Sequence, residues 1–309
     1  ADAPEGVRLA IAAPRGEAKS TFVSLFFVLW AVLTGRKHYI LIIADALEQA
    51  ASLLGAVKDE LEFNEALKRD FPGAGKGHVW NVGTVVTPGN VKIQALGAGK
   101  RMRGLRHGPH RPDLIVLDDL ENDGNVDKPE QRDKLQSWLQ KTVLNLGAAD
   151  GSMDVVYVGT LLHYDSVLAR TLRKPLWKAR TFRSILRWPA RMDLWDEWES
   201  LLSSRGEAEA RRFYRQHRVK MEAGAEVSWP ASRPLYRLMC LRAEDREAFD
   251  SEQQNDPLSA NEAPFNASHF GWTGAGIGCC SERWTRRSAN RARGVTLPRS
   301  SSAASSAGV

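Results

Sequence analysis

The turn APRGEAKST at residues 13–21 contains the first residues whose types and spacing suit chemistry. It lies between an apolar strand and an apolar helix. In such a turn backbone N–H groups bind phosphate oxygens, a lysine reaches the terminal phosphates and the next hydroxyl group ligates Mg²⁺. Lys19 and Ser20 stand where this chemistry requires them. Ala13 and Ala18, however, replace both glycines of the pattern G-x-x-x-x-G-K-[ST]. The segment alone therefore fits a capped helix start with a solvated lysine equally well.

A second set of chemical groups ends the apolar run LIVLDD at residues 114–119. A carboxylate at the tip of a parallel strand, here Asp118, can hold the water shell of Mg²⁺. Its neighbour Asp119 can orient or deprotonate an attacking water. Ligands of open α/β sheets bind at the carboxyl ends of the strands, which supports this interpretation. The alternative is that the two aspartates cap the following turn. Because a phosphate loop precedes the pair in the chain, we favour a Walker B strand.

A third polar position follows the apolar run VVYVG at residues 155–159. Thr160, at the end of this strand, is placed to sense a terminal phosphate and relay its loss. Taken singly, Thr160 is equally well a helix N-cap and His163 a loop histidine with satisfied hydrogen bonds. Three polar strand ends in this order are harder to explain as separate caps.

Two arginine-containing segments complete the set. Arg15 lies inside the phosphate loop, where a guanidinium group can stabilise charge on a transferring phosphoryl group. The loop GAGKRMRG at residues 97–104 is basic and rich in glycine. The alternative for both is solvated surface charge, and only Arg15 gains weight from its location.

Alternating strand and helix patterns over the first 185 residues predict an α/β fold, with a mostly parallel sheet flanked by helices. We predict helices at residues 46–69 and 129–146, and a buried helix in the apolar run 22–33, which is too short to cross a membrane. The predicted strands are Val7 to Ala12, Tyr39 to Ala44, Gly83 to Val86, Val91 to Leu96, Leu114 to Leu117 and Asp154 to Val158.

Composition changes twice along the chain, which divides it into three predicted regions. Residues 1–187 form the α/β core, and residues 188–265 form a small, mainly helical lid or linker, with helices over residues 193–221 and 235–254. Residues 266–309, rich in Gly, Arg, Ser and Ala without periodicity, have the composition of a disordered tail. The chain starts with Ala and has no signal peptide, so we expect it to begin within a longer natural protein.

The overall charge gives a weaker indication of the kind of partner that the chain binds. Lys and Arg outnumber Asp and Glu by 43 to 37, and the pI is near 9.3, which slightly favours a polyanionic partner. The three cysteines, Cys240, Cys279 and Cys280, have no spacing suited to zinc or disulfides, which fits a reducing cytoplasm.

Together, these segments resemble the large terminase subunits of tailed bacteriophages, whose motor domain is an ASCE-type P-loop ATPase. The resemblance covers roughly residues 7–265 and depends on the combination and order of the segments. The family's deviant Walker A resembles APRGEAKST, and its Arg-Gly stretch with Walker B resembles MRGLRHGPHRPDLIVLDDLEND. Its coupling motif resembles VGTLLHYDSVL, and the end of its motor region resembles AFDSEQQNDP. The chain departs from the family's pattern at Ala18 and at Asp119. The family usually has Glu, not Asp, directly after the Walker B aspartate.

The resemblance implies ATP and Mg²⁺ as cofactors and assigns a role to each candidate residue. Ser20 and Asp118 would ligate Mg²⁺, and the catalytic group would be Asp119, with Glu121 as the fallback and Arg15 as a phosphate contact. Gly159, Thr160 and His163 would couple hydrolysis to DNA movement, and Lys100, Arg101 and Arg103 would contact DNA weakly. The residues that would bind ATP are Pro14, Arg15, Gly16, Glu17, Ala18, Lys19, Ser20 and Thr21.

By the same resemblance, the chain would work as a ring that moves double-stranded DNA into a procapsid. Its partners would be the DNA, a portal protein and a small terminase subunit. It would act in the host bacterial cytoplasm and transiently on the procapsid, with no membrane partner.

Large terminases also contain a C-terminal RNase H-like nuclease domain, whose metals are held by several carboxylates. After Phe265 this chain has a single acid, Glu282, so we expect no nuclease activity. GC-rich back-translation from Cys279, re-read in a shifted frame, gives an apolar strand ending in Asp that is similar to the family's first nuclease strand. A frameshifted tail is therefore our hypothesis for residues 266–309.

Two other functions remain open. A helicase-like P-loop ATPase would need a second recombinase-like domain, for which the region after residue 190 is short. A catalytically dead prophage remnant that binds DNA or a protein partner would explain Ala18 and the unusual tail.

Overall fold

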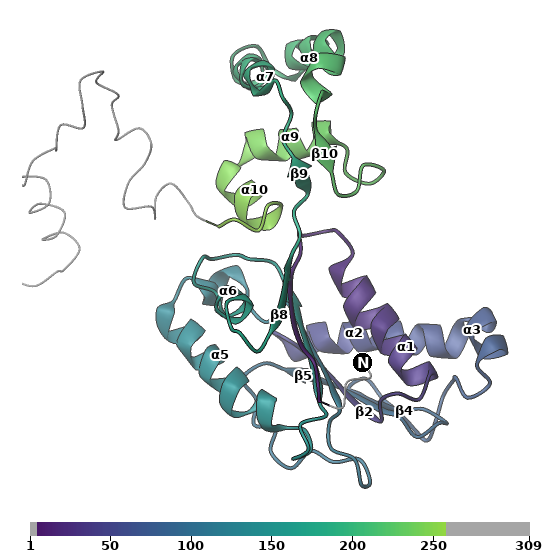
Figure 1. Cartoon of the computed structure of the whole chain (residues 1–309). Coiled ribbons are helices and arrows are strands. Elements are labelled where there is room, and N and C mark those ends of the chain that lie inside the picture. Colours follow the sequence, from purple (N-terminus) through teal and green to yellow (C-terminus); the bar gives the residue numbers. More distant parts are fainter. Residues whose placement is uncertain (1–4, 258–309) are drawn as a thin grey trace, which may run out of the picture. The chain divides into compact units, whose positions relative to one another are not determined.

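The central feature of the computed structural model, which describes residues 5–257, is an eight-stranded sheet with the order β3-β4-β5-β2-β6-β7-β1-β8 (Figure 1). Its strands are β1 (Arg8–Ala12), β2 (Tyr39–Ala44), β3 (Val79–Trp80), β4 (Thr84–Val86), β5 (Lys92–Gly97), β6 (Leu114–Asp118), β7 (Asp154–Gly159) and β8 (Lys178–Thr181). All neighbouring pairs are parallel except at one edge, where β4 runs antiparallel to both β3 and β5.

The central strands are apolar along their whole length because helices cover both faces of the sheet. Every residue of β2, β6 and β7 is buried. Side chains alternate between two core clusters: Leu41 and Ile43 enter one, and Ile40 and Ile42 enter the other. The predicted α/β class, with a mostly parallel sheet flanked by helices, is confirmed.

The helices of this core lie in two layers (Figure 1). One layer contains a π-helical segment (Thr21–Phe27), α1 (Val28–Leu33), α2 (Leu47–Phe63) and α3 (Glu65–Asp70). The other side contains α4 (Asp123–Val126), α5 (Pro129–Lys141), a 3-10 turn (Val143–Asn145) and α6 (Val167–Leu172).

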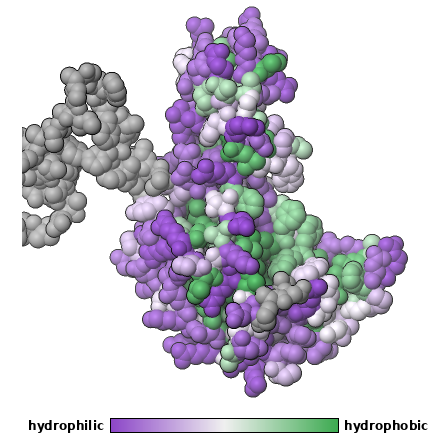
Figure 2. All heavy atoms as spheres, in the orientation of Figure 1, coloured by the Kyte–Doolittle hydropathy of each residue, from purple (hydrophilic) through white to green (hydrophobic). Residues whose placement is uncertain are grey.

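The prediction that residues 22–33 form a buried helix is wrong for one face of that helix. Phe22, Phe26 and Trp30 are 64%, 52% and 39% exposed, whereas Val28 and Ala31 are fully buried. The exposed aromatic residues are four positions apart, so they share the side of the helix that faces away from the sheet. Figure 2 shows hydrophobic surface, in green, in the region where Figure 1 places α1.

Two predicted helices are each divided by a polar residue that caps a new helix. Asn64 ends α2 and caps α3, because its side chain accepts a hydrogen bond from the N–H of Leu67 at 3.0 Å. Asp245 divides the predicted helix 235–254 in the same way, because its side chain accepts a hydrogen bond from the N–H of Ala248 at 2.9 Å. Apolar periodicity continues across such a cap, so it cannot locate the break.

The segment after β8 builds a third core cluster around Trp195 and Trp198, both buried. Its elements are β9 (Ile185–Arg187), α7 (Met192–Arg205), α8 (Glu207–Glu222), β10 (Glu226–Val227), α9 (Leu235–Glu244) and α10 (Arg246–Glu252). We call this segment, residues 183–257, the lid. The predicted tail and its frameshift lie outside the described residues.

No helix within residues 5–257 is both long enough and apolar enough to span a membrane.

Candidate functional site

Three polar segments meet at the carboxyl edge of the sheet. The phosphate loop follows β1, Thr160 follows β7, and Asp118 ends β6. β7 lies between β1 and β6, and all three strands run parallel, so their carboxyl ends are neighbours. The strand order therefore brings the three segments to one edge of the sheet.

The phosphate loop has the backbone shape of an anion cradle. Gly16 and Ala18 have φ angles of +78° and +56°, in the left-handed region. Among the described residues, neither N–H makes a hydrogen bond, so both donors remain available to a ligand. Ala18 adopts a conformation that favours glycine, at a cost of about 1 to 2 kcal/mol for an L-residue. The sequence pattern required glycine there for this reason.

Asp118 is held against the helix that follows the loop. Ser20 Oγ donates to Asp118 Oδ1 at 3.1 Å, and Ser24 Oγ donates to Asp118 Oδ2 at 2.5 Å. Burial raises the pKa of Asp118, and the nearby charge of Asp119 acts in the same direction, while both serines and Lys19 oppose the rise. A hydroxyl and a carboxylate at this distance are hard oxygen donors, so the donor set suits Mg²⁺. Sequence reasoning missed Ser24, although it follows Ser20 by one helical turn.

Lys19 and Asp119 form a direct ion pair in this site. Lys19 Nζ lies 2.9 Å from Asp119 Oδ2, and the Lys19 side chain is only 9% exposed. Asp119 has a φ of +45°, which is unusual for a residue other than glycine, and such outliers cluster at functional sites. A Cβ added to Gly159 would come within 3.3 Å of Asp119 Oδ1, so the strand end of β7 packs closely against this carboxylate.

Glu121, the predicted fallback for Asp119, contacts a different part of the fold. Its carboxylate accepts hydrogen bonds from the N–H groups of Val167 and Leu168, at 2.7 and 3.1 Å, and from the hydroxyl of Tyr157 at 3.2 Å. These contacts are those of a residue that caps the N-terminus of α6. Burial raises the pKa of Glu121, and the backbone hydrogen bonds partly oppose that rise.

The predicted coupling segment is hydrogen-bonded to the phosphate loop. Thr160 Oγ1 donates to the carbonyl oxygen of Ala13 at 3.2 Å, and the N–H of Ala13 donates to the carbonyl of Gly159 at 2.9 Å. His163 is buried, and its Nδ1 accepts from the N–H of Asp165 at 3.0 Å. The structure therefore places Gly159 and Thr160 against the loop and gives His163 local contacts.

The lid also contacts the phosphate loop, through residues that sequence reasoning did not connect. Glu17 Oε1 accepts hydrogen bonds from Ser184 Oγ and Ser228 Oγ, both at 2.7 Å. Arg15, predicted to contact phosphate, pairs instead with Glu252 at 2.8 Å and is 54% exposed. These partners are far apart in the chain, so no local sequence signal indicated the contacts.

The basic loop after β5 is exposed at Lys100, Arg101 and Arg103, and within residues 5–257 none of these side chains forms an ion pair. Trp138 of α5 donates its indole N–H to the carbonyl oxygen of Lys100 at 2.9 Å, which attaches the loop to the core.

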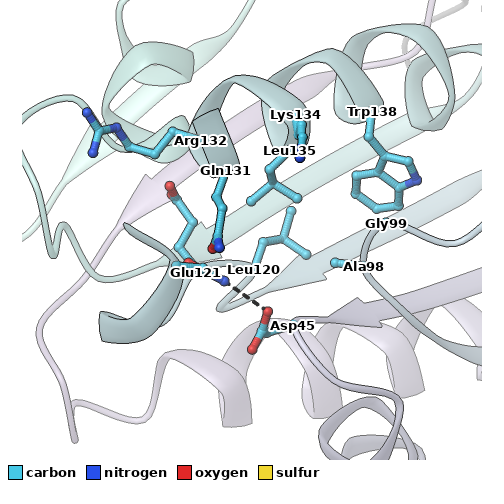
Figure 3. A pocket seen from close by; sticks show the side chains of 11 residues that line it. Asp45, Ala98, Gly99, Leu120, Glu121, Gln131, Arg132, Lys134, Leu135 and Trp138 are labelled. Atoms are coloured by element: carbon cyan, nitrogen blue, oxygen red, sulfur yellow. Dashed lines mark hydrogen bonds between the residues drawn. The ribbon is translucent and has the colours of Figure 1, made fainter. Parts of the chain in front are cut away.

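A cavity of about 370 Å³ lies beside the site and not at the phosphate loop (Figure 3). Its lining includes Asp45, Leu120, Leu135 and Trp138, and no residue of 13–21. Asp45 accepts a hydrogen bond from Asn125 at 3.2 Å. The phosphate loop and this cavity are therefore separate features, and the cavity is lined by α5 and the neighbouring strand ends.

Neither the protein-family models nor the curated proteins contain a match to this chain. Among solved structures, the chain is similar to an arginine-to-alanine mutant of the large terminase ATPase domain of Thermus phage P74-26. The identity is 14%, the TM-score is 0.39, and the match covers 83% of this chain and 90% of that one. A second structure of that ATPase domain matches with 13% identity and a TM-score of 0.36, covering 69% of this chain and 88% of that one. At these TM-scores the likeness adds nothing to the fold class, which the sheet topology establishes.

Proposed function

We propose that this chain is an ATP-hydrolysing motor subunit of a phage terminase, which moves double-stranded DNA into a procapsid. The observation that carries the ATPase part is the meeting of Lys19, Ser20, Asp118 and Asp119 at one edge of the sheet, although the loop and the carboxylates are far apart in the chain. The resemblance of the ordered segments to large terminases supports the packaging part.

The proposed chemistry follows from what each side chain is placed to do. The N–H groups of the loop and Lys19 would bind the phosphates of ATP, and Ser20 and Asp118 would hold Mg²⁺, which neutralises phosphate charge when bound. Asp119 is paired with Lys19, so phosphate binding to the lysine would release its carboxylate to accept a hydrogen bond from the attacking water. Thr160, bonded to the loop, would transmit the loss of the terminal phosphate to β7.

The proposed partners are double-stranded DNA, a portal protein, a small terminase subunit and further copies of this chain in a ring. The exposed cations Lys100, Arg101 and Arg103 support the DNA contact. We propose the host bacterial cytoplasm as the place of action. We propose no nuclease role for residues 266–309, whose sequence has Glu282 as its single acid.

The proposal is tested by ATP turnover of the purified chain, with and without double-stranded DNA. Lys19→Ala should abolish turnover, because the lysine is the loop's only side-chain cation directed at the carboxylates. Lys76→Ala is the matched control, since Lys76 is exposed and outside the loop. Turnover that survives in Lys19→Ala would contradict the assigned site. A wild-type chain without turnover would favour the alternative of an inactive remnant.

DNA unwinding separates the packaging motor from a helicase-like ATPase. A packaging motor should be stimulated by intact duplex DNA without separating its strands. Strand separation in a fluorescent duplex assay would support the helicase alternative instead.

A further inference from the structure

The guanidinium group of Arg233 lies directly over the phosphate loop. A Cβ added to Gly16 would be 2.1 Å from Arg233 Nη2 and 3.0 Å from its Cζ. Gly16 is therefore the residue that lets this side chain approach the loop backbone. The N–H of Gly16 makes no hydrogen bond within the described residues, so a cation and an open donor stand side by side.

Charge distinguishes Arg233 from Arg15, the other arginine at the loop. Arg15 is neutralised by Glu252 at 2.8 Å. Within residues 5–257 Arg233 forms no ion pair, and its Nη1 donates to the neutral side-chain oxygen of Gln253 at 2.5 Å. A guanidinium group has five N–H donors, so most of those of Arg233 are left for another acceptor. A cation with open donors above an anion cradle is suited to phosphate.

The lid holds this side chain in place from both ends. The N–H of Arg233 donates to the carbonyl of Trp229 at 2.8 Å, and Pro234 is the N-cap of α9, whose Leu238 is buried in the lid core. Gln253 is only 5% exposed, and its backbone carbonyl accepts from the N–H of Ser184 at 2.8 Å. Arg233 is thus positioned by residues that do not belong to the phosphate loop.

We infer that Arg233 is the lid's contact with the terminal phosphate of the bound nucleoside triphosphate, an inference that rests on the proposed ATPase function. Through this contact the lid distinguishes a triphosphate from a diphosphate. Loss of the terminal phosphate removes the acceptor of Arg233. The contacts of Glu17 with Ser184 and Ser228, and the ion pair of Arg15 with Glu252, remain between the loop and the lid. The lid thereby responds to hydrolysis directly.

The test compares equilibrium binding of Mg²⁺ with a non-hydrolysable ATP analogue and with ADP, by titration calorimetry on the full chain. Arg233→Ala should weaken binding of the analogue about 10- to 100-fold, as expected for loss of a charge-assisted contact, and binding of ADP less than about threefold. Arg233→Lys should recover part of the loss, because it keeps the charge without the planar fork. Arg237→Ala is the matched control, because Arg237 is exposed on α9, which follows Arg233 in the chain. This variant should bind both nucleotides like the wild type.

Each other outcome has a defined meaning. Equal loss of analogue and ADP affinity in Arg233→Ala would show that Arg233 only supports the loop, and would overturn the inference. Unchanged analogue affinity would overturn it as well. Arg233→Gln provides the same comparison if the alanine variant does not fold, which circular dichroism detects. A wild-type chain that binds neither nucleotide would overturn the proposed function itself.

Discussion

At the scale of single residues, the backbone at Ala18 is the clearest departure from an ordinary phosphate loop. Its φ of +56° strains an alanine but not a glycine. Ala18→Gly should therefore raise the free energy of unfolding by about 0.5 to 1 kcal/mol, because relief of strain exceeds the added freedom of the unfolded chain. Urea denaturation followed by circular dichroism measures this difference.

Ala13 provides the matched control for Ala18→Gly. Ala13 occupies the other glycine position of the loop pattern, but its φ is not in the left-handed region. Ala13→Gly should lower the free energy of unfolding by about 1 kcal/mol, because glycine gains unfolded-state entropy without relief of strain. Equal effects of the two substitutions would contradict the strain at position 18.

The carboxyl group of Asp118 gives a pH-dependent prediction. Its pKa is raised above 3.8 by burial, so the folded state binds its proton more tightly than the unfolded state. The stabilisation from protonation is present below pH 3.8 and is lost as the pH rises through the folded pKa. Asp118→Asn stays neutral, so its melting temperature should exceed that of the wild type at pH 7, with the difference shrinking towards pH 4.

Melting curves across this pH range, recorded without nucleotide or Mg²⁺, check the prediction. The same variant should lose ATP turnover, because the amide cannot replace a metal-binding carboxylate. A melting temperature that falls equally at every pH would instead show that the hydrogen bonds from Ser20 and Ser24 outweigh burial.

At the scale of elements, Asp119 and Glu121 act at different places after β6. Asp119→Asn should lower ATP turnover by about 100-fold or more, as for loss of a general base. Glu121→Gln should lower the free energy of unfolding by about 1 kcal/mol, because an amide nitrogen would face the N–H groups of Val167 and Leu168 at the start of α6. Turnover per folded molecule should stay within about threefold of the wild type.

These two variants are compared by steady-state ATP turnover and by urea denaturation on the same preparations. Equal turnover in Asp119→Asn and the wild type would overturn the assignment of the catalytic carboxylate. A loss of turnover in Glu121→Gln without a loss of stability would transfer the role to Glu121.

The segment that ends the lid also acts as an element. Asn255 Oδ1 accepts from the N–H of Leu161 at 2.8 Å, and its Nδ2 donates to the carbonyl of Phe182 at 2.9 Å. Both contacts join the lid to the strand ends beside the phosphate loop. The segment AFDSEQQNDP therefore connects the lid with the coupling segment through one buried amide.

At the scale of the whole molecule, the proposed DNA contact predicts a change in salt dependence. A triple variant should bind duplex DNA more weakly; it combines Lys100→Ala, Arg101→Ala and Arg103→Ala. It should also lower the slope of log affinity against log salt by about 2 to 3, because each lost phosphate contact contributes about 0.9. Fluorescence anisotropy at several salt concentrations measures both effects.

A matched triple substitution on α8 separates this loop from general surface charge. Arg212, Arg215 and Lys220 are also exposed. Their replacement by alanine should leave the salt slope nearly unchanged if the loop after β5 makes the contact. A larger change from the α8 variant would place the DNA on the lid helices.

The α/β fold class could be predicted from the sequence because its signals are local. Apolar runs such as Tyr39–Ala44 and Asp154–Gly159 must be buried on both faces, which only a parallel sheet between helices provides. The candidate site residues Lys19, Ser20, Asp118 and Asp119 were predicted for a related reason. Parallel strands bring their carboxyl ends to one edge, so strand order along the chain indicates which polar residues meet.

Contacts between the lid and the loop were decided only by the tertiary structure. Arg15 pairs with Glu252, and Arg233 lies over Gly16, although nothing in the spacing of these residues links them. The exposed face of Phe22, Phe26 and Trp30 and the capping role of Glu121 were also hidden from the sequence. The sequence by itself determined the sheet and the types of its strand-end side chains, because burial and backbone pairing act along each segment. Which charge meets which partner depends on the packing of segments distant in the chain, and only the folded structure sets it.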